Sequence, residues 1–242
     1  MLPIIFQNEE IIAINKPHGL FVHRSRMSGT ETEFAMYILR DQIGQKVYPA
    51  HRLDRKTSGV LLFTKTKDGD RKYQGLFQNK KTSKKYLTIV RGYIPEEGTI
   101  DYALTQDDKT KDALTHYKRL ETFEIDLPFG LHQTSRYSLV ELIPMTGRFH
   151  QLRKHMAHIR HPIIGDRPHG CNQQNRLWKE HFEIDTMFLH AQELVLNPTD
   201  EDAITIVASI SDNFEEALNI LRNNRVESRR PTIKLKNDGH SI

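Results

Sequence analysis

Apolar residues in this chain come only in short runs, and this property most restricts what the chain can fold into. The longest runs span four or five residues, as in 11–14 and 60–63. A helix that crosses a membrane needs about 20 apolar residues in a row, so we expect no membrane span. Short apolar runs bounded by polar or turn-forming residues instead indicate buried strands and helices with one apolar face.

The expected elements favour hairpins over alternating strand and helix units. Residues 4–14 are typical of two strands joined by the polar turn 7–10. Further strands are expected at residues 60–65, 86–90, 114–121, 136–143, 187–196 and 203–208. Helices are expected at residues 31–43, 68–80, 149–159 (with Thr146 as N-cap) and 212–223. Hairpins with interspersed helices predict an α+β domain around a mostly antiparallel sheet.

The length of the chain allows one large domain or two small ones. The 242 residues contain no internal repeat, no low-complexity block and no Ser/Gly-rich linker. We expect a single domain over residues 1–224 and a polar, flexible tail over residues 225–242. The first ten residues lack the basic and apolar regions of a signal peptide, and the single cysteine, Cys171, excludes an intramolecular disulfide. These features predict a cytoplasmic protein.

Basic residues are separated from acidic ones along the chain. Residues 71–91 contain Lys and Arg but no acid, and residues 142–179 hold seven Lys or Arg and five His against one acid, Asp166. Such separation can create a surface of one sign that attracts a polyanion, although ordinary solvated helix faces give the same pattern. Two acid-poor segments favour a nucleic-acid partner over the solvated faces.

The stretch HRLDRKTSGVLLFTK, residues 51–65, places one carboxylate, Asp54, between Arg52 and Arg55 and just before a buried strand. Nearby positive charge stabilises an ionised carboxylate, which acts as an acceptor or a nucleophile and not as a general acid. Arg–Asp pairs at strand ends are common and mostly structural. The residues alone therefore leave two interpretations of Asp54, an ion pair that completes a turn and a nucleophile.

A further arginine, Arg153, is expected to be buried. In the expected helix 149–159, Arg153 shares one face with Phe149, Leu152 and Met156. A buried guanidinium needs a carboxylate partner, and Asp54 is a candidate. The alternative is an arginine whose stem packs at the edge of the core while its charged end reaches water.

The sequence contains no recognisable metal or nucleotide-cofactor motif. The histidines within residues 150–161 lack the HExxH spacing, and no acid or cysteine close by completes a site. There is no GxxxxGK[ST] loop, no GxGxxG loop and no paired acidic motif for magnesium. Cys171 has no base near it in the sequence, so it is expected to be inert. We therefore expect neither a cofactor nor a metal ion.

Tyr86 opens an expected strand directly after a lysine-rich stretch that ends with Lys84 and Lys85. Two interpretations are open for this tyrosine. It is a half-buried strand residue with its hydroxyl in water, or it is an aromatic plate for a nucleobase beside lysines that bind phosphate.

Five stretches resemble, in their order along the chain, the motifs of the RluA-type pseudouridine synthases. They are NKPHGLFVH (15–23), HRLDRKTSGVLLFTK (51–65), KKYLTIVRG (84–92), ALTHYKRLE (113–121) and YSLVELIPMTGRFHQLRKHMAHIRHPIIGD (137–166). The similarity extends over residues 4–208. It implies the fold of that family, in which a central, bent, mixed β-sheet carries flanking helices and a catalytic cleft crosses its middle.

The resemblance also implies a reaction and a role for several residues. Such an enzyme detaches uracil from its ribose, rotates it and rejoins it through carbon, without cofactor or metal. Asp54 matches the essential aspartate, which attacks the ribose or the base or removes a ribose proton. Tyr86 matches a tyrosine that packs on the target base and is implicated in proton removal, and Arg153 matches the basic residue that pairs with the aspartate. Arg52 matches an arginine that enters the RNA where the extruded uridine has left.

Within the family, four stretches are most similar to members that act on a uridine in the T-stem of tRNA, at position 65. They are RDQIGQKVYPAHRLD (40–54), TSRYSLVEL (134–142), HPIIGDRPHG (161–170) and QNRLWKEHF (174–182). The first motif begins close to residue 1, so we expect no accessory RNA-binding domain before it. RNA contacts are then expected from the catalytic domain itself, at Arg52, Arg55, Lys84, Lys85, Arg148 and Lys154.

We therefore expect a monomer with tRNA as its partner and no obligate protein partner. The alternatives are a synthase for ribosomal RNA, an RNA-binding protein without catalysis, and a hydrolase that acts through an aspartyl ester.

Overall fold

The computed structural model describes residues 1–24, 29–197 and 203–226. Its strands are β1 (Ile4–Gln7), β2 (Ile11–Lys16), β3 (Tyr48–Pro49), β4 (Ser58–Thr64), β5 (Thr82–Arg91), β6 (Glu97–Asp101), β7 (Leu104–Gln106), β8 (Lys109–Lys111), β9 (Leu114–Ile125), β10 (Ser135–Pro144), β11 (Leu189–Leu196) and β12 (Ile204–Val207). Its helices are α1 (Ala35–Ile43), α2 (Lys67–Gln78), α3 (Gln151–His158), α4 (Asn172–Phe182) and α5 (Asp212–Asn223).

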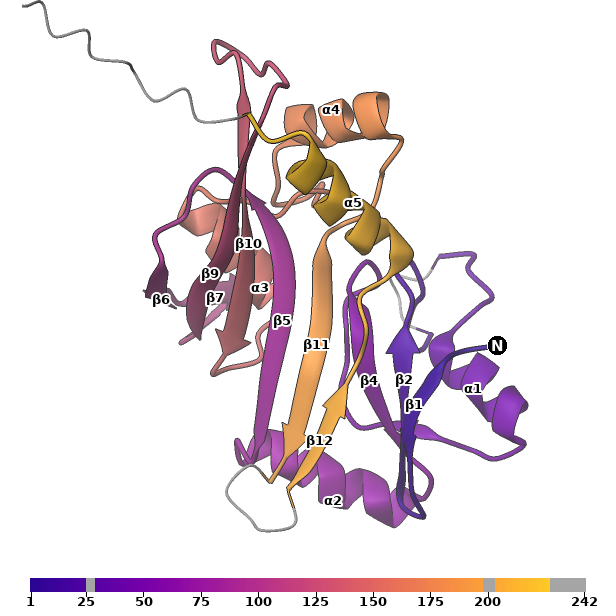
Figure 1. Ribbon diagram of the computed structural model, residues 1–242. Coiled ribbons are helices and arrows are strands. Elements are labelled where there is room, and N and C mark those ends of the chain that lie inside the picture. The colour runs from indigo at the N-terminus through magenta and orange to yellow at the C-terminus, as the bar shows by residue number, and fades with distance from the viewer. Residues whose placement is uncertain (25–28, 198–202, 227–242) are drawn as a thin grey trace, which may run out of the picture.

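One ten-stranded sheet runs through the molecule. Its strand order is β1-β2-β4-β11-β5-β10-β9-β6, with β12 paired to β11 and β3 paired to β4, while β7 and β8 form a separate hairpin. Figure 1 shows β5, which curves strongly, and β11 in the middle, between the N-terminal strands and the β9–β10 pair. Strands β4 and β11 pair in parallel, and the pairings on either side of them are antiparallel. The predicted α+β fold with a mixed, mostly antiparallel sheet is confirmed.

Side chains alternate along β5, so its two sides meet different cores. Leu87 points to the side that α4 and α5 cover, where Trp178 and Phe214 are fully buried. Val90 points to the other side, where Met156 of α3 is buried. Figure 1 shows α5 in front of the sheet and α3 behind β9 and β10. We call these the α5 side and the α3 side of β5.

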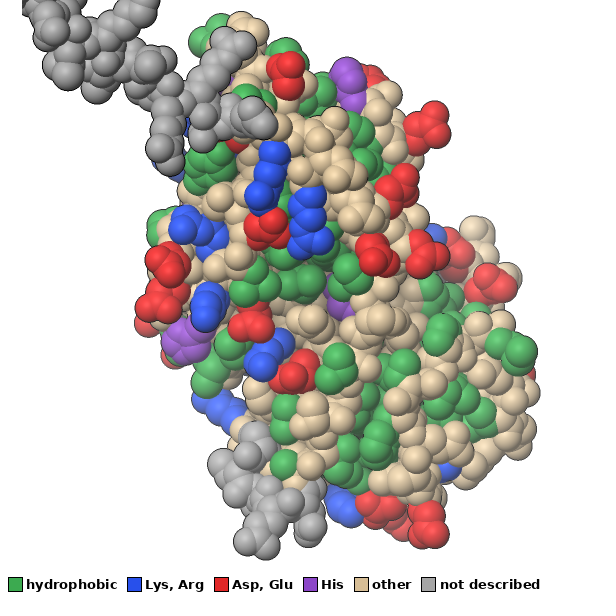
Figure 2. Space-filling view, viewed as in Figure 1, with side chains coloured by type: hydrophobic (Ala, Val, Ile, Leu, Met, Phe, Trp, Pro, Cys, Tyr) green, Lys and Arg blue, Asp and Glu red, His purple; other side chains and the backbone are tan. Residues whose placement is uncertain are grey.

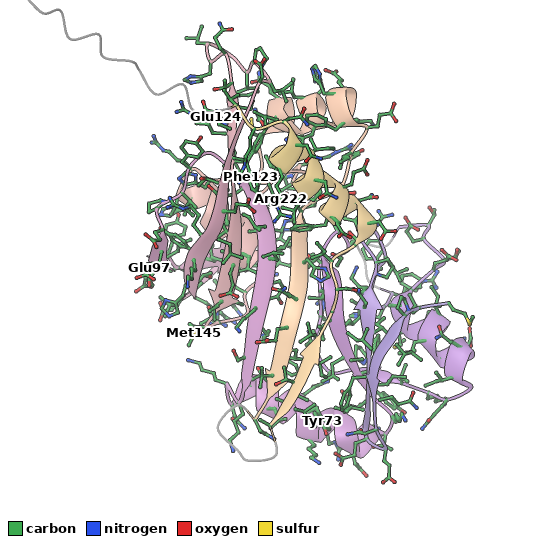
Figure 3. The ribbon with its side chains drawn as sticks, viewed as in Figure 1. Tyr73, Glu97, Phe123, Glu124, Met145 and Arg222 are labelled. Atoms are coloured by element: carbon green, nitrogen blue, oxygen red, sulfur yellow. The ribbon has the colours of Figure 1, made fainter. Side chains whose placement is uncertain are left out.

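The ends of the sheet are tied to the helices by polar contacts. At the lower end in Figure 3, Tyr73 of α2 donates a hydrogen bond to Glu10 Oε2 at 2.8 Å. At the upper end, Phe123 of β9 belongs to the core on the α5 side, and Arg222 of α5 donates to Glu121 Oε2 at 2.9 Å. Both helices are therefore fixed to the sheet by their polar edges as well as their apolar faces.

Gly59 makes the parallel junction between β4 and β11 possible. It pairs with Ala191 and has a φ of +108°, which side-chain-bearing residues rarely adopt. A Cβ at this position would collide with the backbone oxygen of Ala191. Beside it, the Ser58 hydroxyl and His190 Nδ1 form a hydrogen bond of 2.9 Å. The Ser-Gly pair therefore lets two distant parts of the chain approach closely.

One sequence prediction is wrong in detail. Thr146 does not cap the helix that follows: its hydroxyl accepts a hydrogen bond from the Leu114 N–H at 3.0 Å and donates one to Gln151 Oε1 at 2.8 Å. It therefore ties the loop before α3 to β9, and His150 occupies the N-cap position. Of the expected tail, residues 225 and 226 are described, and the Val226 N–H donates to the Glu124 carbonyl oxygen at 2.8 Å. The rest of that tail lies outside the described residues.

Candidate active site

The loop that carries Asp54 joins β3 to β4 and is fixed on both sides of the aspartate. His51 Nε2 accepts a hydrogen bond from the backbone N–H of Leu62 at 3.0 Å. Burial lowers the pKa of His51 to about 3, so the imidazole is neutral and able to accept this bond. The Thr57 N–H donates to the carbonyl oxygen of Asp54 at 3.1 Å and closes a turn. These contacts hold the Asp54 side chain, 26% exposed, at the start of β4.

Lys16 connects this loop to the preceding motif from inside the protein. Its side chain is fully buried, and Nζ donates to the carbonyl oxygens of Pro17 and Leu20 at 2.8 Å and of Arg55 at 3.0 Å. Three acceptors match the three N–H groups of an ammonium ion. Burial lowers the pKa of Lys16 to about 7, and the negative charge of Asp54 opposes that shift. Lys16 thus clamps three backbone carbonyl groups together beside the loop of Asp54.

Arg153 of α3 binds the Asp54 carboxylate directly. Its Nη1 donates to Asp54 Oδ2 at 3.0 Å. Its Nε and Nη2 donate to the two carboxylate oxygens of Asp166, each at 2.8 Å. Side-chain exposure is 6% for Arg153 and 1% for Asp166. One buried guanidinium therefore serves two carboxylates, and of the two only Asp54 is open to solvent.

His150 is the second group that faces Asp54. Its Nε2 lies 3.8 Å from Asp54 Oδ2, and its Nδ1 shares a hydrogen bond of 2.9 Å with His169 Nε2. The backbone of His150 is left-handed, with φ 56° and ψ 26°, and its ring stacks on Phe149 at 3.7 Å between centroids. Burial lowers the pKa of His150 to about 4, so the imidazole is neutral at neutral pH. Such a backbone conformation in a non-glycine residue is strained, and strain of this kind concentrates at functional sites.

Tyr86 lies on the α3 side of β5, between two hydrophobic clusters. Its ring packs against the cluster beneath α1 and the cluster beneath α3. Burial raises the pKa of Tyr86, and the negative charge of Asp54 raises it further. The hydroxyl therefore keeps its proton at neutral pH and is able to donate a hydrogen bond. The structure thus brings Tyr86, Asp54 and Arg153 to one place.

The arginines that flank Asp54 in the sequence point to different surroundings. Arg52 is exposed. Arg55 donates from Nε to the Gly19 carbonyl oxygen at 2.8 Å, pairs with Glu31, and lies over the Phe21 ring at 4.9 Å. Among the described residues, the arginine that forms an ion pair with Asp54 is Arg153, the distant partner considered from the sequence, and neither of its two sequence neighbours.

The two lysines before Tyr86 are separated by the alternation of β5. Lys84 shares the side of Tyr86, and its Nζ lies 5.2 Å from the centroid of the Phe77 ring. Lys85 lies on the α5 side and forms an ion pair of 3.0 Å with Glu193. Only one of the pair is therefore placed near Tyr86.

The remaining two expected RNA contacts lie at the start of α3. Arg148 is exposed, and its Nε donates to the Asp112 carbonyl oxygen at 3.0 Å. Lys154 is half-buried, with Nζ 5.8 Å from the centroid of the Phe149 ring. Both belong to the same segment as His150 and Arg153, so they flank the candidate site.

Sequence reasoning missed three groups that surround Asp54, namely Lys16, His150 and Asp166. A signal existed for Asp166, which is the single acid in a segment of 38 residues rich in basic side chains. An isolated acid among cations is a candidate partner for whichever cation is buried. The position of His150 depended on its left-handed backbone, which no periodicity reveals.

Comparison with known proteins agrees with this geometry. Residues 10–158 match the model of the RNA pseudouridylate synthase family. A solved human structure, RNA Pseudouridylate Synthase Domain Containing 4, superposes with a TM-score of 0.69 at 25% sequence identity, covering 91% of this chain and 93% of that one. The chain belongs to the RNA pseudouridylate synthase family and is an isomerase, as its RluA-type motifs predicted.

More similar relatives carry one shared description. The chain is 48% identical over 221 residues to tRNA pseudouridine synthase C of Yersinia pestis, covering 86% of each protein. It is 44% identical over 229 residues to tRNA pseudouridine synthase C of Vibrio vulnificus (strain CMCP6), covering 89% of this chain and 94% of the relative.

Among the described residues, no three His, Cys, Asp or Glu side chains are grouped so as to hold a metal ion. None of the described helices is both long enough and apolar enough to cross a membrane.

Proposed function

We propose that this protein converts uridine to pseudouridine in tRNA, in the T-stem at position 65, with Asp54, Tyr86 and Arg153 as its catalytic residues. One observation carries the proposal: a partly exposed carboxylate, Asp54, is bound at 3.0 Å by a buried guanidinium, beside the ring of Tyr86. The tRNA substrate is supported by the relatives named tRNA pseudouridine synthase C, which align over most of this chain.

The reaction exchanges one bond of the nucleotide for another. The N1–C1′ bond of uridine breaks and a C5–C1′ bond forms, while a proton leaves C5 and another is taken up at N1, so that the composition is unchanged. An ionised Asp54 supplies the electron pair that starts this exchange, by attack on carbon or by removal of a proton. Arg153 orients the carboxylate, and a charged hydrogen bond is stronger in this buried setting than in water.

Tyr86 and Arg52 act on the base and on the RNA. A uridine in a stem must leave its stack, which costs a few kcal/mol. The Tyr86 ring offers the extruded base a flat surface, and its protonated hydroxyl donates a hydrogen bond. Arg52, exposed on the loop of Asp54, fills the space that the base leaves. Arg148, Lys154 and Lys84 contribute positive charge toward the phosphates around the site.

The same reasoning extends to the organisation of the protein. We propose that residues 1–224 work as one domain, because a single sheet connects β1 with β6. We further propose that the protein acts as a monomer in the cytoplasm, since Asp54, Tyr86 and Arg153 all come from one chain and the sequence contains a single cysteine.

The test measures tritium released from 5-tritiated uridine in transcribed tRNA. The wild-type protein is expected to release tritium from tRNA and to lose this activity when the T-stem uridine at position 65 is replaced by cytidine. Asp54→Asn should abolish release while its folding and tRNA affinity remain. Asp126→Asn, at an exposed position after β9, is the matched control and should react as the wild type does.

Three outcomes would contradict the proposal. Turnover by Asp54→Asn would exclude the aspartate mechanism. Tritium release from ribosomal RNA and not from tRNA would identify ribosomal RNA as the substrate. Binding of tRNA by the wild type without tritium release would indicate an RNA-binding protein without catalysis.

A further inference from the structure

Asp166 is a buried carboxylate in a loop whose backbone is tightly constrained. The loop joins α3 to α4, and the side chain of Asn175 brackets it, accepting from the Gly165 N–H and donating to the Asp166 carbonyl oxygen, both at 2.8 Å. Gly165 has a φ of +83°, and a Cβ there would collide with the Thr186 carbonyl oxygen. The position of the Asp166 carboxylate is therefore set by the backbone around it.

This carboxylate orients the guanidinium that binds Asp54. Its two oxygens engage Nε and Nη2 of Arg153, each at 2.8 Å. A guanidinium is planar and its N–H groups form a rigid fork, so binding one edge fixes the plane of the whole group. The remaining nitrogen, Nη1, is then directed at Asp54 Oδ2, 3.0 Å away. Without Asp166, the same guanidinium would be free to turn and engage Asp54 through two nitrogens.

Asp166 is also connected to the second group that faces Asp54. Its Oδ1 accepts a hydrogen bond from the backbone N–H of His169 at 3.3 Å. The His169 ring bonds to His150 at 2.9 Å, and His150 lies 3.8 Å from Asp54. These contacts end at His150, whose neutral ring lies beyond hydrogen-bonding distance of Asp54, so Arg153 is the group through which Asp166 acts on Asp54.

We propose that Asp166 is a positioning residue for the reaction, which holds the Asp54 carboxylate in place through the guanidinium of Arg153. The proposal rests on the role proposed for Asp54 and adds the group that sets its geometry. Stability alone explains this arrangement poorly, because a buried ion pair is commonly no more stabilising than apolar residues of the same size.

The experiment compares single-turnover rates and tRNA affinity of folded variants. Asp166→Asn is expected to lower the rate roughly 10- to 100-fold, since a small misplacement of a reacting group costs that much. Affinity for tRNA should stay close to that of the wild type, because Asp166 is 1% exposed and does not reach the surface. Gln174→Ala is the control: it removes a buried polar side chain that bonds Tyr137, outside the site, and should leave the rate of the folded protein unchanged.

A double-mutant cycle separates positioning from a merely structural role. If Asp166 acts through Arg153, then Asp166→Asn should have little further effect on the rate in an Arg153→Lys background, in which the fork is already lost. Rate losses that multiply independently would overturn the proposal, and so would an Asp166→Asn rate equal to that of the wild type.

A second variant keeps the test decisive if Asp166→Asn fails to fold. Asp166→Glu retains the charge but moves it by one methylene group. A positioning role therefore predicts a lower rate, whereas a role of the charge in structure alone predicts an unchanged rate. Failure of the proposed function is distinguishable, because it appears as turnover by Asp54→Asn whatever the Asp166 variants do.

Discussion

The two sides of β5 bury different kinds of side chain: one side is apolar, and the other adjoins buried charges. On the α5 side, Leu87 belongs to a core of aromatic and aliphatic side chains that includes Trp178 and Phe214. On the α3 side, Tyr86 adjoins a region where Arg153 and Asp166 are buried together. Burial of charge costs free energy even when the charges are paired. One side therefore supplies stability, and the other uses part of it to bury the charged groups of the candidate site.

The outer surfaces extend this contrast. Figure 2 shows the α5 side of the molecule, where acidic and basic side chains are interspersed and no continuous basic area is seen. The loop of Asp54 and the segment that leads into α3 carry the cations Arg52, Arg148 and Lys154. Positive charge attracts a polyanion, so we expect RNA to bind on the α3 side.

The largest expected effect is on the reaction rate and comes from a change on the α3 side that should leave stability nearly unchanged. Tyr86→Phe should lower the single-turnover rate about 100-fold or more, because it removes the hydroxyl that we assign to the base. Stability should change little, since no protein group in the described part of the chain bonds that hydroxyl. Rate and thermal unfolding are measured on the same preparation; an unchanged rate would limit Tyr86 to packing.

A substitution on the α5 side should have the opposite outcome, with lower stability and an unchanged rate. Phe214→Ala should lower the free energy of unfolding by about 3–5 kcal/mol, because it leaves a cavity against Phe188 in the core. The folded fraction should keep the wild-type rate. Urea unfolding followed by circular dichroism measures the first quantity, and a rate per folded molecule the second. A large fall in that rate would show that the two sides are not independent.

A smaller effect is expected from pH and Lys16. Its folded pKa is about 7 and its unfolded value about 10.5, so between these values the unfolded state holds more protons at this residue. Stability contributed here therefore rises with pH through that window, by up to about 1.4 kcal/mol per pH unit. Unfolding free energies of wild type and Lys16→Met at pH 7 and pH 10 should show a difference that grows in favour of the wild type; a constant difference would contradict the lowered pKa.

The smallest expected effect compares two adjacent lysines. Lys84→Ala should weaken tRNA binding and reduce the slope of log affinity against log salt by about 1, because one phosphate contact is lost. Lys85→Ala, on the α5 side and paired with Glu193, should leave the slope unchanged. Filter binding over a range of salt concentrations measures both. Equal slopes for the two variants would mean that alternation along β5 does not determine which lysine meets RNA.

The sequence predicted best where a periodic pattern was continuous. Helix α5 has the predicted bounds, because Phe214, Leu218 and Leu221 form one apolar stripe. Helix α4 and strands β6 to β8 were not predicted: β7 and β8 are short and mostly exposed, so they lack an apolar pattern. Strands β7 and β8 therefore gave no pattern to read, whereas α4 buries Trp178 and was missed for another reason, since its apolar residues are few and close together in the sequence.

The site was predictable in part for the same reason. Arg153 stood out because an arginine on an apolar helix face must find a carboxylate, and it does bind Asp54. The sequence did not show that Arg153 binds Asp166 through two hydrogen bonds and Asp54 through one. That difference depends on a loop held by Gly165 and Asn175, and the composition does not reveal such loop geometry. Arg52 and Arg55 were poor guides to the ion-pair partner of Asp54, because residues close in sequence on a loop point in different directions.

The Ser58–Gly59 junction has a consequence for how the protein comes to be active. The Ser58–His190 bond joins residues 132 positions apart, and β11 lies between β4 and β5 in the sheet. Contacts this distant in sequence form slowly. During synthesis, the loop of Asp54 and strand β5 with Tyr86 emerge before β11, the strand that lies between β4 and β5 in the sheet. The candidate site is therefore completed only when β11 enters the sheet, so we expect activity to appear late in the folding of the whole domain.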